Sequence, residues 1–591
     1  MSRLVILISL AMTASAAEPV RYTLQFPAPE THYVEVEAKV VSQGRPEVTF
    51  MMPGWTPGSY LVRAFSGRVE SVRAEGPDGS LAVEKSQKNR WVVQMDGASE
   101  VSFRYKVYCR EMSVRSNWVE RDFAILNGAP TFMALLDDSG KPALVAYEIR
   151  LDTPKSWPLS HSGLPQEEGD FHASNYDIVV DSPIFAGDLA VYEFRVNNKL
   201  HYLVNLGEGG VWDGDRSAMD TLKIVDEQVK FWNVVPYETY SFLNAITESR
   251  GGLEHLNSTM LMTSRWTTRT RESYLGWLNL VSHEFFHTWN VKRLRPQAIA
   301  GFDYETENYV SDLWVSEGLT SDYDPLFVRR AGLSTHKEYL KELSGEIEKL
   351  QSAAGRLVQT VEESSYDAWV KYYVRNENTA NTVVSYYTKG AQIGFILDAK
   401  IRRHSKGETT LDDLMRASWE RFSGDTGFTR ESFVDLVGEL SSREIAEWLN
   451  ETVRSAEELD FDETLGWYGL RFKPESDRNE PAAYLGVKTK SGSGVITEVK
   501  RGGPAFEAGL NVSDEILGID DYRVPAGGLA KRLKQYRSGD EIDVLVGRRD
   551  RLLRLKVTTG ETPHGWELEV DPDASESQKQ RLLAWLGAER D

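Results

Sequence analysis

The sequence His-Glu-Phe-Phe-His at 283–287 restricts the fold of this chain more than any other feature. It lies inside a stretch that predicts a helix over about 274–291. Residues four apart in a helix share one face, so the imidazoles of His283 and His287 can bind one zinc ion from the same side. Glu284 lies near that face and can take a proton from a zinc-bound water. Two histidines satisfied inside a buried helix are the alternative interpretation.

A catalytic zinc ion takes three protein ligands and a water, so a third protein ligand is needed. A second predicted helix covers 313–330, and Glu317 stands in it among apolar neighbours. A carboxylate in such a place is costly to bury unless it is paired or binds metal. Glu317 is therefore the predicted third ligand, and an exposed acid near a helix start is the alternative. Asp312 and Glu307 are the next candidates.

Two adjacent tyrosines, Tyr386 and Tyr387, precede an apolar helix predicted over 391–401. A tyrosine hydroxyl directed at the metal can stabilise the oxyanion that forms during attack on a carbonyl. Chemistry alone does not choose between the two, and packing is the alternative role for the pair.

These segments together resemble the zinc aminopeptidases of the gluzincin group. In that group a ligand Glu before Gly follows His-Glu-x-x-His, and a catalytic Tyr precedes x-Lys-Gly, which selects Tyr387 over Tyr386. The same enzymes carry Gly-x-Met-Glu-Asn upstream, and its Glu holds the free α-amine of the substrate. This chain has Gly-Gly-Leu-Glu-His at 251–255, with Met and Asn replaced. The resemblance thus implies substrate-binding roles for Glu254 and Gly252.

A closer resemblance is to the glycyl aminopeptidase family, a gluzincin branch that combines a metallopeptidase with a PDZ domain. His-Glu-Phe-Phe-His-Thr-Trp-Asn-Val-Lys-Arg-Leu-Arg-Pro at 283–296 is similar to the active-site helix of this family, and Pro-Gly-Trp-Thr-Pro-Gly-Ser-Tyr at 53–60 is similar to its N-terminal domain. The resemblance covers nearly the whole mature chain, including the long loop 292–312. It implies an aminopeptidase that prefers glycine or alanine as the first residue.

A chain of 591 residues is long enough for several domains. Alternating strands predict an antiparallel β-sandwich-like N-terminal domain over 17–197. Helices dominate about 274–455 within a predicted catalytic domain over 198–474, as a mostly helical, thermolysin-like domain requires. We expect a multidomain α+β protein in which a PDZ domain over 475–562 and a tail with a short helix over 563–591 follow these two.

The PDZ prediction depends on an ordered set of glycine-containing segments after residue 475. Tyr484, Leu485, Gly486 and Val487 resemble the carboxylate-binding loop of PDZ domains, where backbone N–H groups hold a peptide C-terminus. A small β domain that binds nothing is the alternative.

Residues 1–16 have the pattern of a secretory signal: Arg3, then an apolar stretch, then Ala-Ser-Ala. We therefore expect an exported bacterial protein, periplasmic or secreted. No segment is long and apolar enough to predict a membrane span. The formal net charge of −21 argues against nucleic acid and anionic membranes as partners. Cys109 is the single cysteine, so an intrachain disulfide is excluded.

The resulting hypothesis is a zinc-dependent aminopeptidase acting on peptides with a free N-terminus, with one Zn²⁺ per chain. In it Glu284 acts as general base, Tyr387 stabilises the oxyanion and Glu254 binds the ammonium group. Ser321 and Asp322, four and five residues after Glu317, are candidates for orienting a metal ligand. The alternatives are a zinc endopeptidase with PDZ-directed substrate recruitment and an inactive PDZ adaptor.

Overall fold

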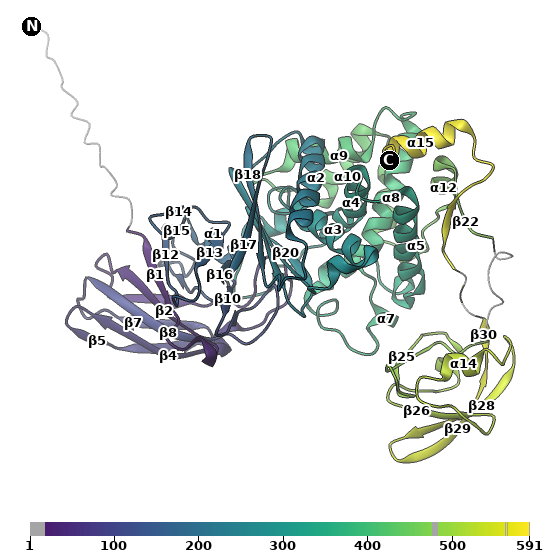
Figure 1. The fold of residues 1–591 in the computed structure, drawn as a ribbon, viewed down its shortest axis with the longest axis horizontal. Coiled ribbons are helices and arrows are strands. Elements are labelled where there is room, and N and C mark those ends of the chain that lie inside the picture. The colour runs from purple at the N-terminus through teal and green to yellow at the C-terminus, as the bar shows by residue number, and fades with distance from the viewer. Residues whose placement is uncertain (1–17, 475–482, 562, 564, 590–591) are drawn as a thin grey trace, which may run out of the picture. The chain divides into compact units, whose positions relative to one another are not determined.

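The computed structural model describes residues 18–474, 483–561, 563 and 565–589 (Figure 1). The predicted signal segment, 1–16, lies outside the described residues. The chain divides into two compact units. The first comprises Met1–Pro57, Arg63–Ala190 and Leu256–Ser258, and the second comprises Gly58–Val62, Val191–His255 and Thr259–Asp591.

The first unit is built from strands whose side chains alternate between buried and exposed, as the period-two pattern predicted. Phe50 and Phe103, from different sheets, stack with ring centroids 4.1 Å apart, so side chains of two sheets meet in one core. Pairing in the largest sheet is antiparallel except between β1 and β12, which run parallel. That sheet has the order β14 (Gln166–Glu167), β15 (Asp170–Ala173), β12 (Tyr147–Asp152), β1 (Val20–Gln25), β2 (Tyr33–Val41), β8 (Glu100–Tyr108), β4 (Val69–Gly76) and β5 (Gly79–Leu81). Two further sheets have the orders β13 (Leu159–Ser162), β16 (Ile184–Gly187), β10 (Phe123–Leu126), β9 (Trp118–Val119), and β11 (Ala134–Leu135), β3 (Glu47–Met51), β7 (Arg90–Gln94), β6 (Val83–Gln87). Short helices are η1 (Pro29–Thr31), η2 (Phe65–Arg68) and α1 (Tyr176–Val180).

The second unit begins with a sheet in the order β17 (Leu189–Val196), β18 (Lys199–Leu206), β19 (Thr239–Ile246), β21 (Ser258–Thr263) and β20 (Gly251–Glu254). β18 and β19 run parallel and are joined through helix α2 (Gly214–Trp232). β20 and β21 form an antiparallel hairpin that leaves β20 at the edge of the sheet.

Helices make up most of residues 267–468 in the second unit, and many begin at a Ser or Thr cap, as Thr270 does for α3 and Ser385 for α8. The expectation of a β-rich N-terminal part followed by a helical part is confirmed. In the described residues the helices are η3 (Thr267–Arg269), α3 (Arg271–Phe286), η4 (Gln297–Ile299), the π-helical turn η5 (Trp314–Gly318), α4 (Leu319–Arg330), α5 (His336–Ser352), η6 (Ala354–Leu357), α6 (Val361–Tyr366), η7 (Asp367–Trp369), α7 (Thr379–Thr382), α8 (Tyr386–His404), α9 (Leu411–Phe422), α10 (Arg430–Leu440), α11 (Arg443–Val453) and α12 (Asp462–Tyr468).

A small β-rich module occupies 483–561 and has its own apolar core, which includes Leu485, Ile516 and Val544. The chain leaves the helices at β22 (Leu470–Phe472) and returns at β31 (Leu568–Val570), and these two strands pair antiparallel. Helix α15 (Glu576–Leu586) then places Trp585 on Tyr468, with ring centroids 4.5 Å apart. The module is therefore inserted between paired strands, as the yellow-green segment and the yellow α15 of Figure 1 show. Its elements are β23 (Ala483–Tyr484), β24 (Val487–Thr489), β25 (Ile496–Val499), α13 (Pro504–Glu507), β26 (Glu515–Ile519), β27 (Tyr522–Arg523), α14 (Leu529–Leu533), β28 (Glu541–Arg548), β29 (Arg551–Thr558) and β30 (Gly560–Glu561).

Among the described residues, every helix is too short or too polar to cross a lipid bilayer.

Candidate metal centre

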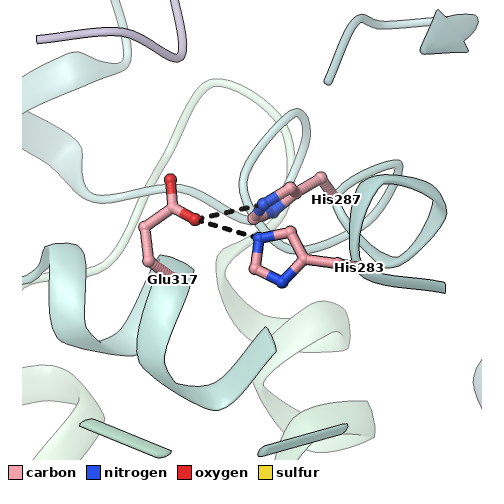
Figure 2. Close-up of side chains that lie close together, drawn as sticks. All are labelled: His283, His287 and Glu317. Atoms are coloured by element: carbon pink, nitrogen blue, oxygen red, sulfur yellow. Dashed lines mark ion pairs between the residues drawn. The ribbon is translucent and has the colours of Figure 1, made fainter. Parts of the chain in front are cut away.

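The two histidines and Glu317 meet in the core of the second unit (Figure 2). His283 lies in the last turn of α3, and His287 caps its C-terminal end. One Glu317 carboxylate oxygen lies 3.5 Å from His283 Nε2 and 3.2 Å from His287 Nε2. Glu317 is 2% exposed and His287 is 1% exposed. The three predicted ligands thus converge, although they come from helices about thirty residues apart.

The second ring nitrogen of each histidine is held by a neighbour. His287 Nδ1 lies 2.7 Å from the main-chain carbonyl oxygen of Asn290, to which it donates. A proton on Nδ1 leaves Nε2 of a neutral imidazole free as a metal ligand. His283 Nδ1 lies 2.9 Å from Asp324 Oδ2. Both rings therefore direct Nε2 towards Glu317.

The residue that orients His283 differs from the two candidates in the sequence. Ser321 and Asp322 were proposed within about one turn of Glu317, but the structure uses Asp324, seven residues on. Residues seven apart share a helix face after two turns, so Asp324 lies on the same side of the helix as Glu317. Counting a single regular turn therefore missed Asp324.

Asn290 holds the turn that carries Glu317 against helix α3. Its side-chain amide donates to the carbonyl oxygens of Val315 at 3.0 Å and Ser316 at 3.1 Å. On the opposite side, an added Cβ on Gly318 would lie 2.6 Å from the Cα of Gly390 in α8. Only two glycines permit this approach. The Glu-Gly and Lys-Gly pairs of the sequence thus bring Glu317 and the start of α8 together.

Of the two tyrosines, Tyr387 is the one whose ring lies against a predicted ligand, His283. Its ring stacks against the ring of His283 with centroids 6.2 Å apart, and its side chain is half-buried. Tyr386 is fully buried and packs on Tyr372, with ring centroids 4.8 Å apart. The structure therefore places Tyr387 within the site and Tyr386 in the packing behind it.

Glu284 lies beside His287, and the main chain of strand β20 packs closely against its carboxylate. An added Cβ on Gly252 would lie 2.0 Å from Glu284 Oε1, so the strand main chain passes directly over the carboxylate. Burial raises the pKa of Glu284 to about 7, although His283 and His287 lower it. Its Oε2 atom is buried without a hydrogen-bond partner among the described residues. A carboxyl with a pKa near 7 can exchange a proton near neutral pH.

Glu254 forms a second cluster with His287 and Glu284, in which one ligand atom of each lies within 4.8 Å of the others. Glu254 is 4% exposed, and within the described part of the chain its Oε1 atom has no hydrogen-bond partner. Burial raises the pKa of this carboxyl, and His287 opposes the effect. A buried carboxylate oxygen without a partner is suited to a cationic ligand.

Sequence reasoning missed the segment Gly58–Val62, which belongs to the second unit. Gly58 has φ +84°, and an added Cβ would lie 2.4 Å from Glu254 Oε1. Burial, followed by the charges of Glu317 and Glu254, raises the pKa of the Tyr60 phenol, so this ring is also near the site. The Pro-Gly-Trp-Thr-Pro-Gly-Ser-Tyr motif was the signal that could have identified both residues.

The donor set fits a zinc ion. Two imidazole nitrogens and a carboxylate oxygen face one another within the distances given above, and this set is typical of catalytic zinc sites. Burial raises the pKa of Glu317, but His287 and His283 outweigh it and lower the pKa to about 2. Glu317 is thus an anion at neutral pH, as a metal ligand must be. The predicted loop Tyr484, Leu485, Gly486 and Val487 lies in the 483–561 module, outside this centre.

Two family models and one solved structure are similar to large parts of this chain. The family described as M61 glycyl aminopeptidase matches residues 276–393, and the Peptidase M61 N-terminal domain matches residues 21–188. A crystal structure of an aminopeptidase N family protein from Idiomarina loihiensis is 30% identical, with a TM-score of 0.89 over 96% of this chain and 100% of that chain.

Crystal structures of an M1 zinc metallopeptidase from Deinococcus radiodurans are more distant. One is 13% identical, with a TM-score of 0.45 over 75% of this chain and 95% of that chain. The search of curated proteins gave no match. The match over both domains and the whole-length similarity at 30% identity show that the chain is a peptidase and belongs to the M61 glycyl aminopeptidase family.

Proposed function

We propose that this protein is a zinc-dependent aminopeptidase that releases the N-terminal residue of peptides, with glycine or alanine preferred. The observation that carries the proposal is Glu254: a buried carboxylate oxygen without a described partner, within 4.8 Å of ligand atoms of His287 and Glu284. An ammonium group held there would lie about one residue from the metal centre. That arrangement selects the first peptide bond of a substrate.

His283, His287 and Glu317 would hold one Zn²⁺ per chain, which when bound lowers the pKa of a water and polarises the scissile carbonyl. Glu284 takes the proton of the attacking water and passes it to the leaving amine. The Tyr387 hydroxyl donates to the carbonyl oxygen as negative charge develops on it. Strand β20 is at the edge of its sheet, so its main chain can pair with an extended substrate.

The preference for a small first residue is supported by the crowding around Glu254. The main chain at Gly58 lies so close that a Cβ added there would be 2.4 Å from Glu254 Oε1. Tyr60, in the same segment, is also buried. A large side chain next to the bound ammonium would have to displace this segment. Glycine and alanine need no such movement.

For the 483–561 module we propose a PDZ fold in which Tyr484, Leu485, Gly486 and Val487 bind a peptide C-terminus. Gly486 has φ +77°, and its carbonyl oxygen accepts from the Lys500 N–H, so the loop is fixed at its centre. Export to the periplasm or beyond is likewise a proposal, based on the signal pattern at 1–16.

Replacing Glu254 by Gln tests the aminopeptidase proposal. A charge-assisted contact to an ammonium contributes roughly 1.5–3 kcal/mol, so kcat/KM for glycyl arylamides should fall by about tenfold or more. The matched control is Glu248→Gln, an exposed acid between β19 and β20, which should change nothing. Equal cleavage of free and N-acetylated peptides by the wild type would favour an endopeptidase instead.

A further inference from the structure

A cavity of about 370 Å³ lies between helices α4, α5 and α8 of the second unit. This volume is in the range of small-molecule sites and can hold one long side chain. Four carboxylic acids line it: Asp322 and Asp324 from α4, and Glu342 and Glu346 from α5.

The residues that line the cavity supply little positive charge to these acids. Among the described lining residues Lys349 is the one basic side chain; it is 64% exposed and lies 3.4 Å from Glu346. Burial, then the charges of Asp324 and Glu346, raises the pKa of Glu342 to about 8. Burial also raises the pKa of Asp322, with the charge of Asp398 adding to it. A cation inside the cavity would relieve this repulsion.

An uncharged side chain independently indicates a hydrogen-bond donor as the ligand. Gln392, from α8, lines the cavity and is 1% exposed. Its Oε1 atom has no hydrogen-bond partner in the described part of the chain. A buried amide oxygen left without a donor is costly. An ammonium or guanidinium group would supply that donor and the missing positive charge together.

The cavity borders the proposed metal centre on the His283 side. Asp324 lines it and lies 2.9 Å from His283 Nδ1, and Tyr387 lines it and stacks on the His283 ring. Glu254 instead clusters with His287 and Glu284. If the ammonium of a substrate is bound at Glu254, as the proposed function requires, the residue after the cleaved bond falls on the His283 side.

We propose that this cavity binds the basic side chain, Lys or Arg, of the residue that follows the cleaved bond. The inference rests on the proposed aminopeptidase function and adds a substrate class to it: peptides that begin with a small residue followed by a basic one.

The test compares Gly-Lys-amide, Gly-Arg-amide, Gly-Leu-amide and Lys-Leu-amide as substrates of the full-length zinc-loaded protein. The expected kcat/KM for the two basic substrates is at least about tenfold above that for Gly-Leu-amide. In the Glu342→Gln, Glu346→Gln double variant this ratio should fall towards one, while cleavage of Gly-Leu-amide stays within about threefold of wild type. Glu348→Gln, an exposed acid on the same helix α5 that does not line the cavity, is the control and should keep the ratio.

If the ratio of kcat/KM for the basic substrates to that for Gly-Leu-amide is the same in the wild type and the double variant, the cavity assignment is overturned. It is also overturned if lysine raises kcat/KM only in Lys-Leu-amide, where it is the first residue. If the double variant does not fold by circular dichroism, the two single variants replace it. If no glycyl peptide is cleaved, the proposed aminopeptidase function fails. A binding measurement then tests the cavity proposal separately from that function. Calorimetry on the Glu284→Gln variant should then still give tighter binding of Gly-Lys-amide than of Gly-Leu-amide, and equal affinities would overturn the cavity claim too.

Discussion

Replacing Gly252 by Ala should disable Glu284 without removing the metal. The added Cβ would lie 2.0 Å from Oε1 of Glu284, 2.5 Å from its Cδ and 2.7 Å from its Cγ. Ordinary contact begins near 3.4 Å, so the carboxylate has to move by roughly 1 Å or more. A misplacement of about 1 Å can cost on the order of 10²-fold in rate, close to 2.7 kcal/mol of activation free energy.

The fold should tolerate this change. Gly252 does not have positive φ, so alanine fits its main chain, and the atom it meets is the end of a flexible side chain. We therefore expect kcat for glycyl arylamides to fall about a hundredfold, with zinc content and melting temperature near those of the wild type. Gly276→Ala in α3 is the control, because its Cβ would meet nothing within 4 Å. Near-normal turnover of Gly252→Ala, or loss of its zinc, would refute the reasoning.

Three further changes give distinct results. Glu317→Ala should lose zinc in metal analysis, whereas Glu284→Gln should keep zinc and lose about 10²-fold or more in turnover; zinc retained at wild-type affinity without Glu317 would place the third ligand elsewhere. Burial raises the pKa of Asp312 to about 7 from the usual 3.8, so the folded state binds its proton more tightly and stability falls as pH rises from about 4 to about 7. Asp312→Asn should therefore raise the melting temperature at pH 8 and not near pH 4. An equal rise in melting temperature at both pH values would contradict a raised pKa for Asp312. Replacing 475–565 by a short turn between the paired β22 and β31 should spare hydrolysis of small arylamides within about threefold, and a folded but inactive product would show that the module shapes the site.

The convergence of the three predicted ligands was predictable because their chemistry is local. His283 and His287 are fixed by helix geometry, and Glu317 by the cost of burying an acid near them. The alternation of β2 and β8 likewise predicted strands with one buried face, since period two is a property of the strand itself.

The rest depends on contacts between distant segments. Asp324 contacts His283 from a position two helical turns after Glu317, and Gly58 lies against Glu254 across about two hundred residues of sequence. β22 pairs with β31, and the Trp585 ring packs on the Tyr468 ring. These contacts join the chain before the inserted 483–561 module to the chain after it. Hydrophobic periodicity carries no information on such pairings. Glycine motifs that permit close approach, such as Gly318 against Gly390, were the remaining signal.

The most direct test of the central claim is mass spectrometry of the products formed from one peptide, Gly-Ala-Leu-Lys-amide, and from its N-acetylated form. We predict that the zinc-loaded protein removes glycine and then alanine from the free peptide and leaves the acetylated peptide intact. The metal-stripped protein should form no product until zinc is restored. Internal cleavage of the acetylated peptide, or equal activity after metal removal, would contradict the account.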